Sequence, residues 1–173
     1  MNEVLKAIRT RRSVKRYKPD LPDEASIRQV AEAGSCAASG MNAQSPIILA
    51  VADRALRDRL SALNAGVLGS DSDPFYGAPA VLVVLADRNR PTHVYDGSLV
   101  MGNMMLAAHA LGLGSCWIHR AKEVFESDEG RAILKALGVE GEYEGIGHLV
   151  LGFPEGELPA EKPRKADYIR YIR

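Results

Sequence analysis

Apolar residues recur at helical spacing in several stretches of the chain. Near the start, Val4 and Leu5 precede Ile8 by four and three residues, which places them on one helix face. A second stretch follows Asp23, a residue type that favours the N-cap position of a helix. The sequence predicts helices at about 2–10, 24–36, 54–64 and 95–111, and a mainly helical stretch at 124–137.

Short apolar runs rich in valine, leucine and isoleucine predict buried β-strands. The run at 79–86 is apolar along nearly its whole length, which is typical of a central strand. The helix predicted at 95–111 is apolar on nearly every side, so we expect it to pass through the middle of the molecule. The predicted strands lie at 47–52, 79–86, 115–119 and 146–153.

The remaining segments read as loops and a tail. Residues 37–46 are small and polar, and 66–76 are rich in Gly, Ser and Asp, so we expect the second of these loops to be the most mobile. The tail from 158 to 173 is basic and ends on apolar side chains, which predicts docking onto a partner such as a second subunit. With no repeat or linker, the sequence predicts one domain over 1–173 with a C-terminal arm at about 158–173.

Composition is that of a globular protein, but charge is distributed unevenly. The 173 residues are 46% hydrophobic and 25% charged, with a formal net charge of zero, which argues against a general nucleic-acid binder. Residues 1–20 hold seven Lys/Arg and two Asp/Glu, a balance of +5, and residues 160–173 hold five and two, a balance of +3. Residues 21–159 therefore carry −8. Basic ends on an acidic body indicate either a local anionic ligand or arms that dock on an acidic surface.

Several functional classes lack their sequence signatures. Gly112-Leu113-Gly114 follows a predicted helix and precedes a predicted strand, the reverse of the order in a dinucleotide-binding loop, and no Walker A motif is present. Cys116 and His119 have a spacing that suits a metal, but no second pair lies nearby, so no metal site is expected. No nucleophile elbow indicates a hydrolase, and Cys116 is expected to pack in the core.

Two cysteines do not form a disulfide framework, so Cys36 and Cys116 are expected to be reduced. The sequence contains no apolar run long enough to span a membrane, and its first twelve residues lack an apolar signal core. We therefore expect a cytoplasmic protein without a membrane or nucleic-acid partner.

Two short basic segments, near opposite ends of the chain, are the strongest candidates for a binding site. Arg11, Ser13 and Lys15 alternate along the first, and Lys162 and Arg164 along the second. In an extended backbone, alternate residues share one face. Guanidinium, ammonium and hydroxyl groups on such a face suit a phosphate. A solvated helix end is equally compatible with the first segment, whereas its single aromatic residue disfavours nucleic-acid binding.

Four motifs follow one another along the chain in a known order. They are Arg11-Arg12-Ser13-Val14-Lys15, the loop from Ser39 to Gln44 with Asn42, the stretch from Leu106 to Ile118, and Gly152-Phe153-Pro154 followed by Lys162-Pro163-Arg164-Lys165. Together they resemble the FMN-dependent nitroreductases over nearly the whole sequence. The chain departs from the usual family pattern at Lys15, where arginine is common, at Ala38-Ser39, where Pro-Ser is usual, and at Ser45-Pro46, where Pro-Trp is usual.

This resemblance implies a fold and an assembly. The fold is α+β with three layers, in which helices flank a mixed, mainly antiparallel central sheet. The assembly is a tight homodimer with two FMN molecules at its interface. The long helix at 95–111 would form much of that interface, and the C-terminal arm would wrap the other subunit.

The resemblance also implies which residues bind FMN. The phosphate would be held by Arg11, Ser13, Lys162 and Arg164, with Arg12 in support. Lys15 would lie near N1 and the C2 oxygen of the flavin, where a cation stabilises the reduced ring. The remaining implied contacts are Ser39, Asn42 and Gln44 along the ring or ribityl chain, and backbone groups of Trp117, Ile118 and His119 near N5.

The activity implied by the resemblance is ping-pong hydride transfer through flavin N5. NADH or NADPH would donate the hydride, and a small electron-poor acceptor such as a nitroaromatic, a quinone or an activated alkene would then take it. Water could supply the proton, so no catalytic side chain is assigned. The alternatives are a specialised superfamily member, such as a reductive dehalogenase or a dehydrogenase, and a non-catalytic flavin-binding protein.

Overall fold

In the computed structural model, which describes residues 2–173, four strands form one antiparallel sheet in the order β1-β2-β4-β3. The strands are β1 Pro46–Val51, β2 Ala80–Asp87, β3 Gly114–Ile118 and β4 Tyr143–Gly152. The interior position of β2 confirms the prediction of a central strand at 79–86, because every residue from Ala80 to Ala86 is buried. Beside the β3 edge of this antiparallel sheet, Ser13 forms an isolated parallel bridge with Ser115.

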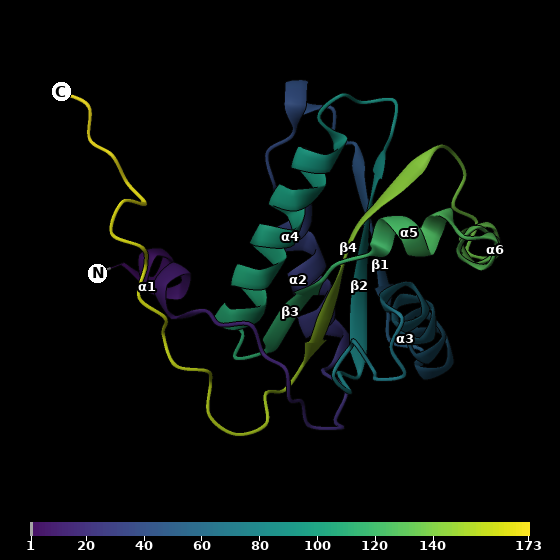
Figure 1. Cartoon of the computed structure of the whole chain (residues 1–173), viewed down its shortest axis with the longest axis horizontal. Coiled ribbons are helices and arrows are strands. Elements are labelled where there is room, and N and C mark those ends of the chain that lie inside the picture. The colour runs from purple at the N-terminus through teal and green to yellow at the C-terminus, as the bar shows by residue number, and fades with distance from the viewer. Residues whose placement is uncertain (1) are drawn as a thin grey trace.

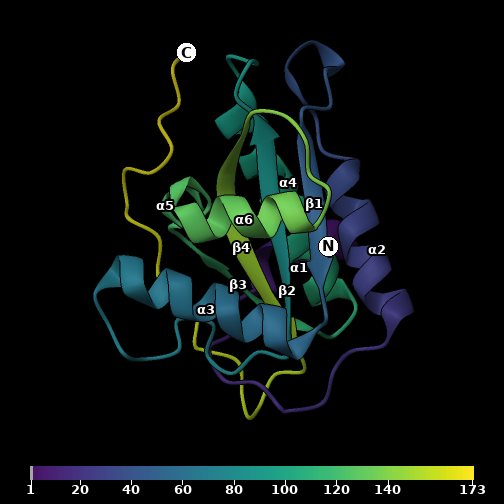
Figure 2. The same cartoon turned by 90° about the vertical axis from the view of Figure 1, so that its right-hand side faces the viewer.

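Helices cover both faces of the sheet (Figures 1 and 2), as the three-layer prediction requires. One face carries α2 Glu24–Ser35 and α4 His93–Ala110, and the other carries α3 Arg54–Leu68, α5 Ala121–Glu126 and α6 Asp128–Ala136. Neighbouring residues of β2 enter different cores, since Val81 and Val83 pack toward α3 and α5 whereas Leu82 and Val84 pack toward α2 and α4.

Local chemistry accounts for where the helices begin and end. The Asp23 carboxylate accepts a hydrogen bond from the Ser26 N–H, so the predicted N-cap of α2 is confirmed. The stretch at 124–137 is mainly helical, as predicted, and it is divided at Ser127, which is extended and whose hydroxyl caps α6 at the Gly130 N–H. The predicted end of α3 is wrong, since the helix continues through Gly66 to Leu68.

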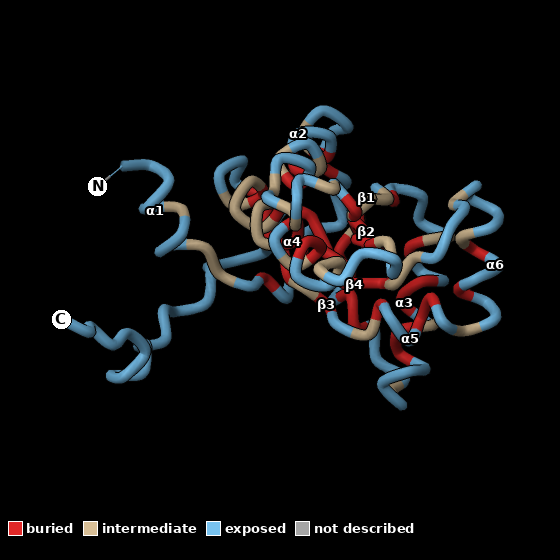
Figure 3. Tube along the Cα trace, turned by 90° about the horizontal axis from the view of Figure 1, so that it is seen from above, coloured by how far each residue is buried: buried red, intermediate tan, exposed pale blue. Residues whose placement is uncertain are grey.

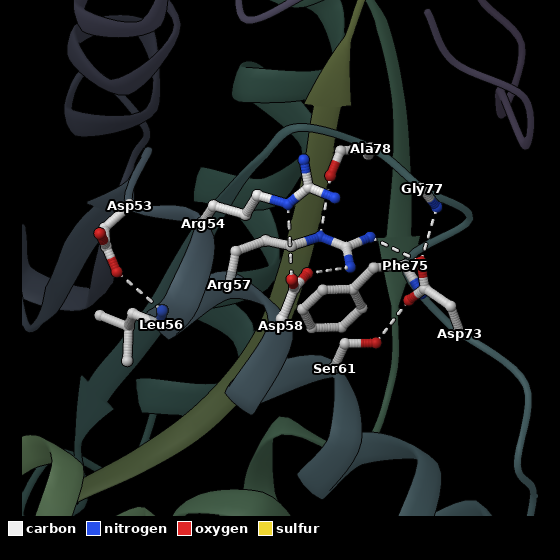
Figure 4. A network of polar contacts seen from close by, with 10 residues as sticks. All are labelled: Asp53, Arg54, Leu56, Arg57, Asp58, Ser61, Asp73, Phe75, Gly77 and Ala78. Atoms are coloured by element: carbon white, nitrogen blue, oxygen red, sulfur yellow. Dashed lines mark hydrogen bonds and ion pairs between the residues drawn. The ribbon is translucent and has the colours of Figure 1, made fainter. Parts of the chain in front are cut away.

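The last four residues of the loop expected to be mobile, 73–76, belong to a turn at 73–78 that is tied to α3 (Figure 4). Asp73 accepts hydrogen bonds from the Arg57 guanidinium at 2.7 Å and from the Ser61 hydroxyl. Arg57 is buried under this turn and also donates to the Ala78 carbonyl at 2.9 Å. Two side chains of α3 therefore fix both ends of the turn.

The first helix and the C-terminal tail lie on the same side of the molecule, away from the sheet (Figures 1 and 3). Helix α1, Glu3–Thr10, has no buried residue and lies beside α4. The tail after β4 is exposed throughout residues 155–173. Tyr171 and Ile172 are 85% and 94% exposed, so the predicted apolar end of the arm has no cover within the chain.

Candidate functional site

The first basic segment is extended along the edge of the sheet, which decides between the two conformations that the sequence left open. Val14 N–H donates to the Ser115 carbonyl at 3.0 Å, which ties the segment to β3. Val14 points into the core, whereas Ser13 and Lys15 are exposed and share the outward face. A methyl group at Gly114 would meet the Val14 side chain at 2.9 Å, so this close approach requires glycine.

Arg11 holds a buried donor that has no partner within the described part of the chain. One terminal nitrogen of its guanidinium is buried without a hydrogen bond. His109 on α4 lies nearby, and its Nε2 is 2.7 Å from the Thr10 hydroxyl. Burial lowers the pKa of His109, and the charges of Arg11 and Arg12 lower it further. A buried, unpaired guanidinium donor fits an anion, since such groups are normally satisfied.

Arg12 has a different role from Arg11 in the structure. Its guanidinium donates to the carbonyls of Arg9 and Arg11, near the end of α1. A second nitrogen lies 3.3 Å from the Glu161 carboxylate. This ion pair holds the tail beside the first basic segment. Glu161 directly precedes Lys162, the first residue of the second basic segment. The structure therefore brings the two basic segments together, with Lys162 and Arg164 exposed on the tail.

Lys15 lies over the ring of Tyr76, with 5.4 Å between the ammonium nitrogen and the ring centroid. The Cys116 thiol, close to Ser13 and Lys15, is buried as predicted. Burial raises the pKa of Cys116, although the Ser13 hydroxyl and the charges of Lys15 and Arg11 partly oppose that effect. The thiol is therefore protonated at neutral pH and packs as a core residue.

The end of β3 is supported by a polar group that sequence patterns did not reveal. Asn64 of α3 is fully buried and donates to the His119 carbonyl at 2.7 Å. Its side-chain oxygen accepts from Nε of Arg120 at 3.1 Å, and Arg120 has a left-handed backbone with φ 73°. Behind Asn64 lies His148, whose pKa burial lowers to about 3, with Arg120 adding to the effect. These contacts fix the turn at His119 and Arg120, where the chain leaves the sheet after Trp117 and Ile118 of β3.

The loop predicted to lie beside a flavin is organised by Asp96 of α4, which the sequence analysis missed. This buried carboxylate accepts hydrogen bonds from Gly40 N–H at 2.9 Å and from the hydroxyls of Ser45 and Thr92 at 3.0 Å. Burial alone would raise the pKa of Asp96, but these hydrogen bonds hold it below its usual value. A charged carboxylate therefore anchors both ends of the loop.

Within that loop the predicted residues contact one another. The Ser39 hydroxyl accepts from Gln44 N–H at 3.0 Å, and the Gln44 amide lies 3.4 Å from the Asn42 side-chain oxygen. Both Asn42 and Gln44 have left-handed backbones, with φ of 54° and 49°. Met41, which precedes Asn42, is 98% exposed. The loop is thus fixed at its base and presents its tip to the outside.

The structure separates the predicted site residues into two groups. Ser13 and Lys15 lie beside β3, at the end of the sheet where β2 begins. The loop from Ser39 to Gln44 lies beside β1, at the opposite sheet edge, and at the far end of β2, where Ser45 bonds to Asp87. An eight-residue strand spans about 23 Å, so these groups do not surround one pocket of a single chain.

The structure lacks the features of two other classes of protein within the described residues. Within residues 2–173, no group of three or more His, Cys, Asp or Glu side chains is arranged to hold a metal ion. In the same part of the chain, every helix is too short or too polar to cross a bilayer.

Comparison with known proteins identifies the class. The model of the Nitroreductase family matches residues 8–70 and 68–153, so the chain belongs to the nitroreductase family of oxidoreductases. An Archaeoglobus fulgidus protein, provisionally named an NADH dehydrogenase/NAD(P)H nitroreductase, is 30% identical over 91% of this chain and 88% of its own. The Bacillus subtilis protein named FMN reductase [NAD(P)H] is 25% identical over 95% of this chain and 70% of its own.

A solved structure agrees in fold over the full length. The Bacteroides fragilis nitroreductase with bound FMN superposes with a TM-score of 0.92 at 29% identity, and each chain is completely covered. The predicted α+β fold and the predicted family are therefore confirmed. The chain is a flavin oxidoreductase by family and by fold.

Proposed function

We propose that the protein binds FMN and uses NADH or NADPH to reduce small electron-poor acceptors such as nitroaromatics and quinones. The buried, unpaired nitrogen of Arg11 is the observation that carries the proposal, because it marks an anion site on the first predicted motif. Bound FMN would supply the redox chemistry by accepting a hydride from the donor and passing it to the acceptor. The cytoplasmic location stays a prediction.

Each group of residues has a distinct task in this proposal. Arg11 and Ser13 would bind the phosphate, and the tail cations Lys162 and Arg164 would cover it. Lys15 would place positive charge beside the flavin ring, where it stabilises the reduced form. The backbone of 117–119, held by Asn64, would present polar groups to the reactive side of the ring. No side chain is assigned as an acid or base.

The separated loop supports a homodimer with shared sites. The loop from Ser39 to Gln44 cannot join Arg11 within one chain, so we propose that a second copy supplies it. Exposed apolar side chains offer an interface, including Tyr95 at 72% and Leu99 at 51% on α4 and Val4 at 65% on α1. The apolar end of the arm would dock on the same partner.

A mixed dimer tests this assembly. One chain carries Arg11→Ala, and a differently tagged chain carries Asn42→Ala together with Gln44→Ala. If sites are shared between subunits, the mixed dimer has one intact site and one doubly altered site, so it binds one FMN per dimer at wild-type affinity. If each site belongs to one chain, both sites stay defective and the mixed dimer binds no better than its parents.

Steady-state kinetics test the order of reaction. Because one flavin face would serve donor and acceptor in turn, we expect parallel lines when initial rates are measured at several fixed acceptor concentrations. The control uses the same enzyme preparation with menadione and with a nitroaromatic, since the pattern should not depend on the acceptor. Lines that intersect would mean that both substrates bind together, and the shared face would be wrong.

A further inference from the structure

The backbone around Tyr76 is held in an unusual conformation. Tyr76 has φ 54° and Gly77 has φ 69°, so two consecutive residues are left-handed. Glycine adopts this conformation freely, whereas for a bulky side chain such as tyrosine it is rare. Non-glycine residues persist there where surrounding contacts fix them, and they cluster at functional sites. We therefore infer that a side-chain function, and not turn geometry alone, accounts for a tyrosine at this left-handed position.

Those surrounding contacts come from one carboxylate. Asp73 accepts hydrogen bonds from the backbone N–H groups of Phe75 at 2.8 Å and Gly77 at 2.7 Å, on either side of Tyr76. The guanidinium of buried Arg57 holds the same carboxylate from below (Figure 4). Burial would raise the pKa of Asp73, but its hydrogen bonds outweigh burial and lower it. The charged Asp73 carboxylate thus fixes the backbone on both sides of Tyr76.

The ring is directed at the first basic segment. Its centroid lies 5.4 Å from the Lys15 ammonium, which is within the range of a cation–π interaction. Tyr76 is 37% exposed, so its ring is not required to fill the core. A lysine stem is flexible, and an ammonium without a fixed contact samples many positions. The ring therefore gives the exposed Lys15 ammonium a defined contact.

We propose that Tyr76 is a positioning residue, whose ring holds the Lys15 ammonium toward the flavin and thereby raises the reduction potential of the bound cofactor. The inference rests on the proposed function, because it requires FMN beside Lys15. Tyr76 itself need not touch the ring system. The Asp73 turn, which lies far from the phosphate site in sequence, becomes part of the control of cofactor electronics.

The test compares Tyr76→Leu with Tyr76→Phe in the purified holoenzyme. The readouts are the dissociation constant of oxidised FMN and the midpoint potential of the bound flavin. Loss of the ring should weaken binding of reduced FMN relative to oxidised FMN about two- to fivefold, the size of an exposed cation–π contact. For a two-electron couple, a tenfold change in this affinity ratio shifts the midpoint potential by about 30 mV, so the expected fall in midpoint potential is about 10 to 20 mV. Phenylalanine keeps the ring and should keep the potential.

A double-mutant cycle shows whether the effect passes through Lys15. In a Lys15→Met background, Tyr76→Leu should leave the potential unchanged, because the cation has already been removed. An equal fall in both backgrounds, or a fall with Tyr76→Phe as large as with Tyr76→Leu, would overturn the inference. If Tyr76→Leu does not fold, Tyr76→Gly removes the ring and suits the left-handed backbone, and the same fall is expected.

The outcomes also separate this inference from the function on which it rests. A wild-type protein that binds FMN, with a potential that Tyr76→Leu does not alter, overturns the role of Tyr76 alone. A wild-type protein that fails to bind FMN overturns the proposed function, and the role of Tyr76 with it.

Discussion

Replacing Arg11 with Ala is expected to weaken FMN binding about a hundredfold. A hydrogen bond between charged groups contributes about 1.5–3 kcal/mol, and every 1.4 kcal/mol is about tenfold in affinity. Arg11 carries a buried donor that is already desolvated and unpaired in the structure, so an anion gains its full interaction. The measurement is titration of apoprotein with FMN, followed by quenching of flavin fluorescence.

Lys18→Ala is the matched control for Arg11. Lys18 lies seven residues after Arg11, just beyond the first basic segment, and its replacement removes one exposed positive charge. We expect less than a threefold change, because an exposed charge acts through solvent. Equal losses in the two variants would show that general electrostatic attraction, rather than a defined phosphate contact, holds the cofactor.

Replacing Asp96 with Ala should destabilise the protein by roughly 3 kcal/mol, because it leaves three donors without their acceptor. These are Gly40 N–H and the hydroxyls of Ser45 and Thr92. Urea unfolding at pH 7 measures the loss, with exposed Asp71→Ala as the control. A loss no larger than that of the control would mean that the loop does not depend on Asp96.

The effect of Asp96 should also depend on pH. Its pKa in the folded protein lies below the ordinary value, so folding favours the charged carboxylate. The stabilisation is therefore complete above the unfolded-state pKa of about 3.9 and is lost as the pH falls through the folded-state pKa. The stability difference between wild type and Asp96→Ala should narrow in strong acid. A difference that stays constant down to pH 2 would contradict this assignment.

Local chemistry made much of the fold predictable. Val81 to Leu85 form an apolar run that belongs to a strand buried on both faces, and Asp23 occupies the N-cap that its residue type favours. The error at the end of α3 occurred where local signals conflict, because Gly66 opens a stretch rich in Gly, Ser and Asp, yet the helix continues past it. The stretch at 124–137 is mainly helical, as predicted, and Ser127 divides it into two helices. Element types followed from periodicity, whereas boundaries depended on individual caps.

The site was predicted unevenly for a physical reason. Ser13 and Lys15 were identified because their alternation within one extended segment is a local pattern. Asp96 and Asp73 were missed because their partners are remote: Gly40 lies 56 residues before Asp96, and Arg57 lies 16 residues before Asp73. The residues next to an aspartate in the sequence do not show which distant N–H groups will donate hydrogen bonds to its carboxylate. Such contacts follow from tertiary packing.

Titration of the purified, cofactor-free protein with FMN tests the central claim most directly. Absorption between 400 and 500 nm monitors binding, and mass spectrometry identifies the flavin released from protein purified without added cofactor. The account predicts a yellow protein that binds one FMN per chain, which is two per dimer. Addition of NADH or NADPH should bleach the absorption of the bound flavin. A colourless protein that takes up no FMN would contradict the account, and the two basic segments would then require another anionic ligand.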